Sequence, residues 1–209
     1  MRQLILKMSI SIDGFISDLD GTNTWMFGAD QEAKAWSVEY LSNASLHIMG
    51  SRSFRDMAAW WPTSTDQFAP PMNLIPKTVF SRQGPAFLRT ISTAAAFEVA
   101  CAKSAELQPG AESWAGAYVA SGDLKEEIAK LKAQDGKPII AHGGVSFARS
   151  LVAQGLADQI ALIVAPVALG KGLALFCELV APMPLQLASS KAFPGGAVAQ
   201  IYRPANVER

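Results

Sequence analysis

The chain has 209 residues, of which half are hydrophobic and 17% are charged, and its 18 basic residues balance its 18 acidic ones. This composition excludes intrinsic disorder, and without a basic stripe to hold phosphates it argues against nucleic acid binding. The longest nearly apolar stretch, Ile160 to Leu169, is far too short to cross a bilayer. We therefore expect a cytoplasmic protein with one domain, residues 1–209, and no membrane partner.

Strand-like runs alternate with helical patterns along the chain. The predicted strands are rich in Ile, Val and Leu: Gln3–Ile10, Leu46–Met49, Lys77–Phe80, Ala117–Ala120, Pro138–Ala141 and Gln159–Ala165. The predicted helices are Gln31–Leu41, Ser53–Ala59, Ala94–Ala105, Leu124–Lys132 and Ser146–Gln154. This alternation favours a mostly parallel sheet with helices on both faces.

The end of the chain has a different pattern. Two alternating runs, Leu185–Ala192 and Ala197–Arg203, flank Phe193-Pro194-Gly195-Gly196 and predict an antiparallel hairpin. The expected fold class is α/β, with three αβα layers, a mostly parallel central sheet and an antiparallel C-terminal hairpin.

A glycine pair, Gly143-Gly144, separates a predicted buried strand from a predicted helix. Glycine lets the backbone approach a ligand closely, and the free N–H groups and dipole of a helix N-terminus favour a pyrophosphate. The same pair also fits an ordinary tight turn between a strand and a helix.

Two other predicted strands end in hydroxyl and guanidinium groups. Gly50-Ser51-Arg52-Ser53 follows the second strand, and Ser81-Arg82 follows the third. Parallel sheets commonly bind ligands at these strand ends, and the planar donors of arginine suit phosphate. A single such arginine is usually solvated surface, whereas two beside a glycine turn indicate an anion site. His47 and His142 are far apart in sequence and lack an acidic cluster, so no metal site is predicted.

Four motifs occur together in order: SISIDGFI, IMGSRSF, FAPPMNLIPKTVFSR and IIAHGGVSFARSL. The order and approximate spacing of these motifs resemble those of the dihydrofolate reductase-like superfamily. The stretch from Lys137 to Phe176 is particularly similar to the reductase domain of riboflavin biosynthesis. The resemblance implies a dihydrofolate reductase-like fold and NADPH as the cofactor.

The resemblance also implies three parts of an NADPH site. The phosphates on the adenosine side would meet Gly50, Ser51, Arg52 and Ser53, with Ser81 and Arg82 around the adenine ribose and its 2′-phosphate. The pyrophosphate would meet His142, Gly143, Gly144, Val145 and Ser146, with Phe147 just behind. The nicotinamide side would meet Ile16 and Ser17. Relatives often carry a basic residue where this chain has Ser51, so the preference for NADPH over NADH depends on Arg52 and Arg82.

Hydride transfer to a C=N or C=O carbon needs a proton for the heteroatom. By resemblance, Asp13 and Asp30 are the catalytic candidates, and the substrate pocket would contain both of them with Trp25 and Phe147. Asp13-Gly14 equally fits a turn, and Asp30 stands where the N-cap of a helix is expected.

The resemblance predicts an NADPH-dependent oxidoreductase that reduces a small heterocyclic or carbonyl substrate. A ribosylaminopyrimidine phosphate, as in riboflavin biosynthesis, is one candidate substrate. A dihydrofolate or pterin reductase is an alternative, although Ile75-Pro76-Lys77 lacks the arginine that grips the folate tail. A second alternative is a nucleotide-binding module that keeps the cofactor site but catalyses no reaction. Relatives of the riboflavin type pair, so a homodimer is possible.

Overall fold

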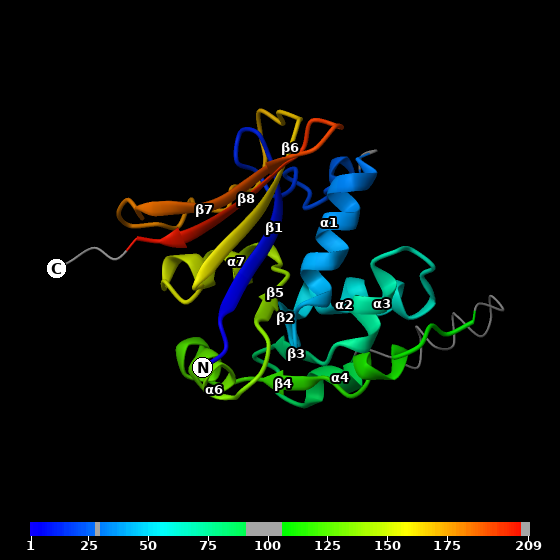
Figure 1. The fold of residues 1–209 in the computed structure, drawn as a ribbon. Coiled ribbons are helices and arrows are strands. Elements are labelled where there is room, and N and C mark those ends of the chain that lie inside the picture. The colour runs from blue at the N-terminus through cyan, green and yellow to red at the C-terminus, as the bar shows by residue number, and fades with distance from the viewer. Residues whose placement is uncertain (28–29, 91–105, 206–209) are drawn as a thin grey trace.

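The computed structural model describes residues 1–27, 30–90 and 106–205. Within these residues eight strands form one twisted sheet in the order β4-β3-β2-β5-β1-β6-β8-β7 (Figure 1). The strands are β1 (Leu4–Ser11), β2 (Leu46–Gly50), β3 (Lys77–Phe80), β4 (Tyr118–Ala120), β5 (Ile139–Ala141), β6 (Gln159–Ala165), β7 (Leu185–Ala192) and β8 (Val198–Pro204).

Every pairing among β1 to β6 is parallel, whereas β8 pairs antiparallel with both β6 and β7. The predicted fold class is therefore confirmed, including the C-terminal hairpin. Buried residues occupy both faces of β1, β2 and β5, which explains their nearly continuous apolar sequences.

The main helices begin and end close to the predicted positions. They are α1 (Gln31–Ser42), α2 (Ser51–Trp60), α6 (Leu124–Ala133) and α7 (Val145–Ala153). The Asp123 side chain caps α6 by accepting from the N–H groups of Lys125 and Glu126. The predicted helix Ala94–Ala105 lies outside the described residues.

Several short helices were not predicted. These are α3 (Ala69–Leu74), α4 (Ala86–Thr90) and the 3₁₀ turns η1 (Thr24–Phe27), η2 (Trp61–Thr63) and η3 (Ala111–Trp114). Two prolines at the start of α3 obscured it in the sequence, although proline is tolerated in the first helical turn because that N–H has no intrahelical partner.

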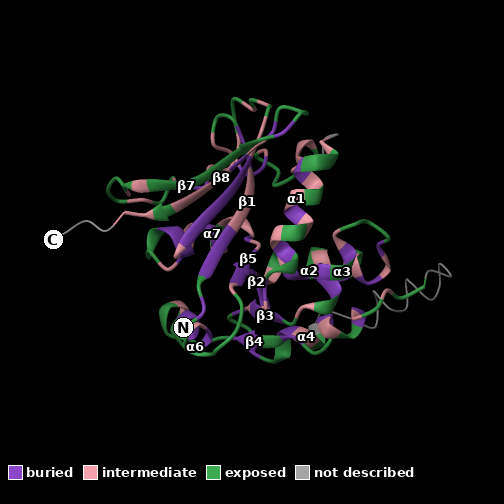
Figure 2. Cartoon of the chain, viewed as in Figure 1, coloured by how far each residue is buried: buried purple, intermediate pink, exposed green. Residues whose placement is uncertain are grey.

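Two apolar layers cover the sheet, one on each face. Figure 2 shows that buried residues concentrate in the central strands. One layer joins the sheet to α6 and α7 and includes Leu4, Leu6 and Leu151. The other joins it to α1, α2, α3 and η3 and includes Phe54 and Trp114. Side chains alternate between the two faces along each strand, so odd and even positions of β1 belong to different layers.

The C-terminal hairpin forms the edge of the sheet. Seven of the eight residues of β7 are exposed, and the hairpin extends away from the body of the protein in Figure 1. None of the described helices is long and apolar enough to cross a membrane.

Candidate functional site

The candidate site forms where the carboxyl ends of β2 and β5 turn into α2 and α7. The Gly50 N–H donates to the carbonyl of Gly143 over 3.0 Å, and the Gly144 N–H donates to the Ser53 hydroxyl over 2.8 Å. The structure thus brings together two of the predicted segments, which are about ninety residues apart in sequence.

Glycine is required at the second of these turns. Gly143 has a φ of +86°, and a Cβ there would lie 3.0 Å from the Met8 sulfur. A Cβ at Gly144 would lie 2.9 Å from the Ser53 hydroxyl oxygen. These contacts explain the glycine pair by backbone conformation and close packing, and they also leave the backbone bare at the start of α7.

Two helices begin side by side at these turns without a side-chain cap. The N-cap residues are Gly50 for α2 and Gly144 for α7, and neither provides a capping hydrogen bond. The first backbone N–H groups of both helices therefore remain free to donate, and both dipoles favour negative charge nearby. The predicted Ser51, Val145 and Ser146 are half-buried or exposed here, and Arg52 is exposed. This arrangement fits the pyrophosphate of a dinucleotide.

The end of β3 lies beside the same turns. Phe80 and Phe147 pack with ring centroids 4.8 Å apart, which places Ser81 and Arg82 next to the start of α7. The Ser81 hydroxyl accepts from the Gln83 N–H over 3.2 Å. Arg82 is exposed and has no hydrogen bond or ion pair with any described residue. Its guanidinium is therefore free to bind an anion.

Ile16 and Ser17 occupy a more enclosed position than expected. They are 3% and 2% exposed, and both pair through their backbone with Leu173. Ile16 belongs to the apolar layer that contains α7. Their side chains therefore face the protein interior, and their predicted contact with a nicotinamide ring stays a prediction.

The two aspartates predicted to be catalytic both hold loops together. Asp13 accepts from the Ser11 hydroxyl and from the N–H groups of Leu169 and Gly170. The hydrogen bond from Ser11 is the largest cause that lowers the pKa of Asp13; desolvation opposes it, and the N–H groups of Gly170 and Leu169 lower the pKa further. In this arrangement Asp13 is ionised at neutral pH and has no proton to donate, so the structure gives no support to a general acid at this position.

Asp30 has the capping role that the sequence offered as its alternative. One carboxylate oxygen accepts from the Ala33 N–H over 3.0 Å at the start of α1, and the other accepts from the Gly195 N–H over 2.8 Å. Asp30 thereby fastens α1 to the turn of the β7–β8 hairpin. Trp25 lies nearby in sequence and is half-buried, with an indole N–H that has no partner among the described residues. Within the described residues, no hydrogen bond or ring contact joins Asp30 or Trp25 to Phe147.

The sequence reasoning missed Lys7, which the structure places beside the glycine turn. It is half-buried in the middle of β1, and burial lowers its pKa to about 8. It has no hydrogen bond or ion pair within the described parts of the chain. Burial, followed by His47, lowers the pKa of His142, and the charge of Lys7 adds to this effect. A lysine inside an otherwise apolar central strand was the signal that could have identified it.

Two histidines, the buried His47 and the half-buried His142, lie next to Lys7 on the face that α1 and α2 cover. His47 and His142 pack edge to face with ring centroids 4.6 Å apart. Both nitrogens of His47 and the Nε2 of His142 lack a hydrogen-bond partner in the described residues. The Leu41 carbonyl lies near His47 but outside hydrogen-bond geometry. No group of three or more potential metal ligands occurs in the portion that the structure describes. We refer to Lys7, His142 and His47 as the open basic row.

Comparison with known proteins identifies the class to which this fold and site belong. The family model described as the RibD C-terminal domain matches residues 2–199, so the chain belongs to that family. This membership and the fold confirm the predicted resemblance and a reductase-type fold.

Individual relatives are similar over nearly the whole chain. The chain is 25% identical over 201 residues to the uncharacterized protein YyaP of Bacillus subtilis (strain 168), covering 96% of this chain and 94% of the relative. A protein provisionally assigned to riboflavin biosynthesis from Shewanella sp. PV-4 is 18% identical, with a TM-score of 0.69 and coverage of 98% and 99% of the two chains. Dihydrofolate reductase from Enterococcus faecalis, solved with NADP(H), is 11% identical, with a TM-score of 0.59 and coverage of 98% and 97%. At these identities the solved structures support the fold.

Proposed function

We propose that this protein is an NADPH-dependent reductase that transfers hydride to a small heterocyclic or carbonyl substrate. The observation that carries the proposal is the joined pair of strand-to-helix turns, Gly50–Ser53 and Gly143–Ser146, at which two uncapped helices begin. Membership of a reductase family supports the same conclusion.

When bound, the dinucleotide supplies the hydride. The protein would hold its pyrophosphate with the backbone N–H groups at the start of α2 and α7. Arg82, exposed and without a partner in the described chain, would bind the 2′-phosphate, with Arg52 as a second cation. In these roles the protein groups would orient the cofactor and would not themselves react.

Lys7 would provide the proton that accompanies hydride transfer. Burial sets its pKa at about 8, so near neutral pH it is mostly protonated yet can release its proton readily. If Lys7 is the donor, kcat/KM should fall as the pH rises through about 8. Replacement of Lys7 by methionine should lower kcat by roughly 10²–10⁴-fold while NADPH binding persists.

The first experiment measures thermal stability with and without NADPH, NADP⁺ and NADH. A ligand that binds only the folded state at about 100 times its dissociation constant adds roughly 2.7 kcal/mol. A clear rise in Tm with NADPH, smaller with NADH, supports the proposal and leads to a screen of reducible substrates. No rise with any nucleotide would overturn it.

The 2′-phosphate assignment has its own test. Arg82→Ala should weaken binding of NADPH far more than binding of NADH, because only NADPH carries that phosphate. Arg203→Ala, which removes another exposed arginine on β8, is the matched control and should change neither affinity. Equal losses for the two nucleotides in the Arg82 variant would contradict the assignment.

Two alternatives make distinct predictions. A dihydrofolate or pterin reductase would turn over dihydrofolate, but Lys77 is buried among protein partners and is not available to grip a folate tail. A ribosylaminopyrimidine phosphate would make the protein a riboflavin-type reductase and can be assayed directly. A non-catalytic module would bind NADPH tightly and turn over none of these compounds.

The expected homodimer and cytoplasmic location also remain proposals. The exposed edge of β7 is where a second copy could pair, because its backbone groups lack a neighbouring strand on one side. Light scattering at micromolar concentration should then return twice the mass of the chain, and a monomeric mass would remove the idea.

A further inference from the structure

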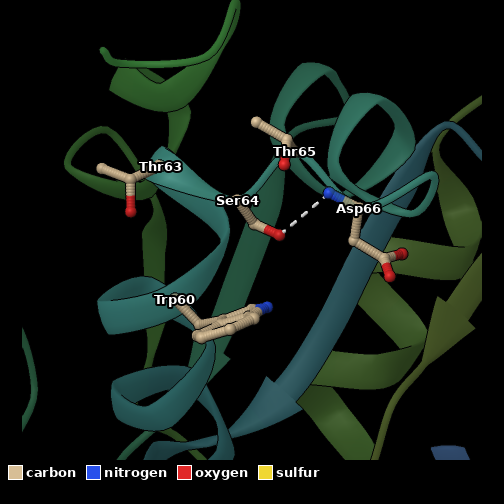
Figure 3. Close-up of a pocket in the computed structure, with 5 residues that line it drawn as sticks. All are labelled: Trp60, Thr63, Ser64, Thr65 and Asp66. Carbon is tan, nitrogen blue, oxygen red and sulfur yellow. Dashed lines mark hydrogen bonds between the residues drawn. The ribbon is translucent and has the colours of Figure 1, made fainter. Parts of the chain in front are cut away.

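A cavity that is open to solvent lies at the far end of α2 from the glycine turns. Its volume is about 370 Å³, and its walls are Trp60, Thr63, Ser64, Thr65 and Asp66. Figure 3 shows the Trp60 indole on one side of this space, with the polar side chains of the following loop on the other. Because the cavity is open on one side, a ligand would rest against its walls and stay partly exposed to solvent.

Trp60 presents an unusually open aromatic surface. Its side chain is 62% exposed, whereas the adjacent Trp61 is half-buried and packs against Phe68 with ring centroids 6.3 Å apart. Two consecutive tryptophans thus have different environments, and the apolar layer of the core accounts only for the second. The indole face of Trp60 is therefore exposed to solvent, and the polar side chains of the following loop lie beside it without covering it.

Hydrogen bonds within the loop fix its polar groups. The Asp66 N–H donates to the Ser64 hydroxyl over 3.2 Å, and one Asp66 carboxylate oxygen accepts from the Phe68 N–H over 2.9 Å. The second carboxylate oxygen and the hydroxyls of Thr63 and Thr65 have no hydrogen bond with any described residue. They remain available to a ligand.

The chemistry of these groups selects a ligand class. No lysine, arginine or histidine lines the cavity, and the Asp66 carboxylate would repel an anion. A hydroxyl both donates and accepts, so the threonines match ligand hydroxyls better than an ammonium group, which can only donate. The negative face of an indole attracts weakly positive C–H groups, which a sugar ring presents on one face while its hydroxyls point outward. We propose that this cavity binds a neutral sugar ring stacked on Trp60.

This sugar site is separate from the proposed cofactor site. The glycine turns lie at Ser51, where α2 begins, and the cavity lies at Trp60, where α2 ends. A ten-residue α-helix is about 15 Å long, so a ring stacked on Trp60 would not reach the uncapped helix starts. Failure of one proposal therefore leaves the other intact.

The test uses the full chain and three probes, D-ribose, D-glucose and D-galactose, in ligand-observed saturation-transfer NMR. At least one sugar should show transfer from the native protein. Trp60→Ala should weaken that binding by about tenfold or more, corresponding to roughly 1.4 kcal/mol. Trp60→Phe should retain part of it, because a ring face remains.

Control variants make the outcome specific. Tyr118→Ala removes another exposed ring, 57% accessible and on β4, and should leave sugar binding unchanged. The NADPH-induced rise in Tm should be the same in Trp60→Ala as in the native protein. The proposal is overturned if no sugar binds, if binding survives Trp60→Ala, or if choline binds at Trp60 while the sugars do not.

Discussion

Two lysines in the parallel sheet face the same layer of helices but have opposite surroundings. Lys77 in β3 is 3% exposed, donates to the Asn73 carbonyl over 2.8 Å and to the Ser113 hydroxyl, and lies 4.6 Å from the centre of the Trp114 ring. Lys7 in β1 has no such partner among the described residues. We refer to Asn73, Lys77, Ser113 and Trp114 as the closed network.

Under the proposed function, the difference separates a charge that builds the fold from a charge that serves a ligand. Burial lowers the pKa of both lysines, that of Lys77 to about 7 and that of Lys7 to about 8, so each charge destabilises the fold. The closed network gives Lys77 two hydrogen bonds that offset part of this cost. The open basic row leaves this compensation incomplete beside the glycine turn. Incompletely paired, perturbed groups in such a place are typical of functional sites, which perturb pKa values for a purpose.

The largest expected effect comes from opening the closed network. Asn73 is fully buried, accepts from the Trp114 indole N–H over 2.8 Å and donates to the Trp61 carbonyl over 2.8 Å. Asn73→Ala should therefore lower the free energy of unfolding by about 2–5 kcal/mol, since each unpaired buried group costs roughly 1–3 kcal/mol. Urea denaturation measures this change, and the exposed Asn43→Ala is the control. A loss below 1 kcal/mol would show that the network does not stabilise the fold.

His47 allows a pH test of the open basic row. Burial, followed by the charge of Lys77, lowers its pKa to about 3 from 6.5. The unfolded chain takes up a proton below pH 6.5 and the folded chain does not, so His47 removes stability as the pH falls from 6.5 towards 3. As the pH falls from 7 to 4, the free energy of unfolding of His47→Leu should rise by roughly 2–4 kcal/mol relative to that of the native protein. A stability difference independent of pH would contradict the depressed pKa.

Lys7→Met should stabilise the protein, in contrast to its expected damage to catalysis. Burial lowers the pKa of Lys7 to about 8 from 10.5, so the charged form destabilises the folded state fully below pH 8. This penalty disappears as the pH rises to 10.5, where the unfolded chain also loses the proton. The free energy of unfolding of the variant should exceed that of the native protein by about 1–3 kcal/mol at pH 7 and should equal it above pH 10.5. Denaturation across that pH range measures the difference. Lys77→Met is the matched control. Burial lowers the pKa of Lys77 to about 7, so this variant also loses a penalty, but it gives up two hydrogen bonds and its gain in the free energy of unfolding should be the smaller of the two.

The two regions also differ in how far the sequence predicts them. Apolar periodicity locates β1 and β5 within a residue or two, and the glycine pair predicts the turn before α7, because both depend on local chemistry. The closed network joins Asn73 to Ser113 and Trp114, forty residues further along the chain, and no local pattern indicates such a pairing. The same limitation applies to the distant partners of Asp13 and Asp30, Gly170 and Gly195, which lie more than 150 residues away in loops that only the fold brings together. The cap that Asp30 provides for α1 is local, and the sequence offered it.

The smallest expected change in stability tests whether polar links in the open region serve the ligand more than the fold. The Ser53 hydroxyl accepts from the Gly144 N–H and joins the two uncapped helix starts. Ser53→Ala should lower the free energy of unfolding by only about 0.5–1.5 kcal/mol, the contribution of one partly buried hydrogen bond. Under the proposed function it should also weaken NADPH binding by roughly tenfold, because loss of this link frees the turn that would hold the pyrophosphate. Isothermal titration measures the affinity, and the exposed Ser42→Ala, on α1, is the control. A large loss of stability with unchanged affinity would place Ser53 with Asn73, as a residue of the fold, and would remove the distinction between the two regions.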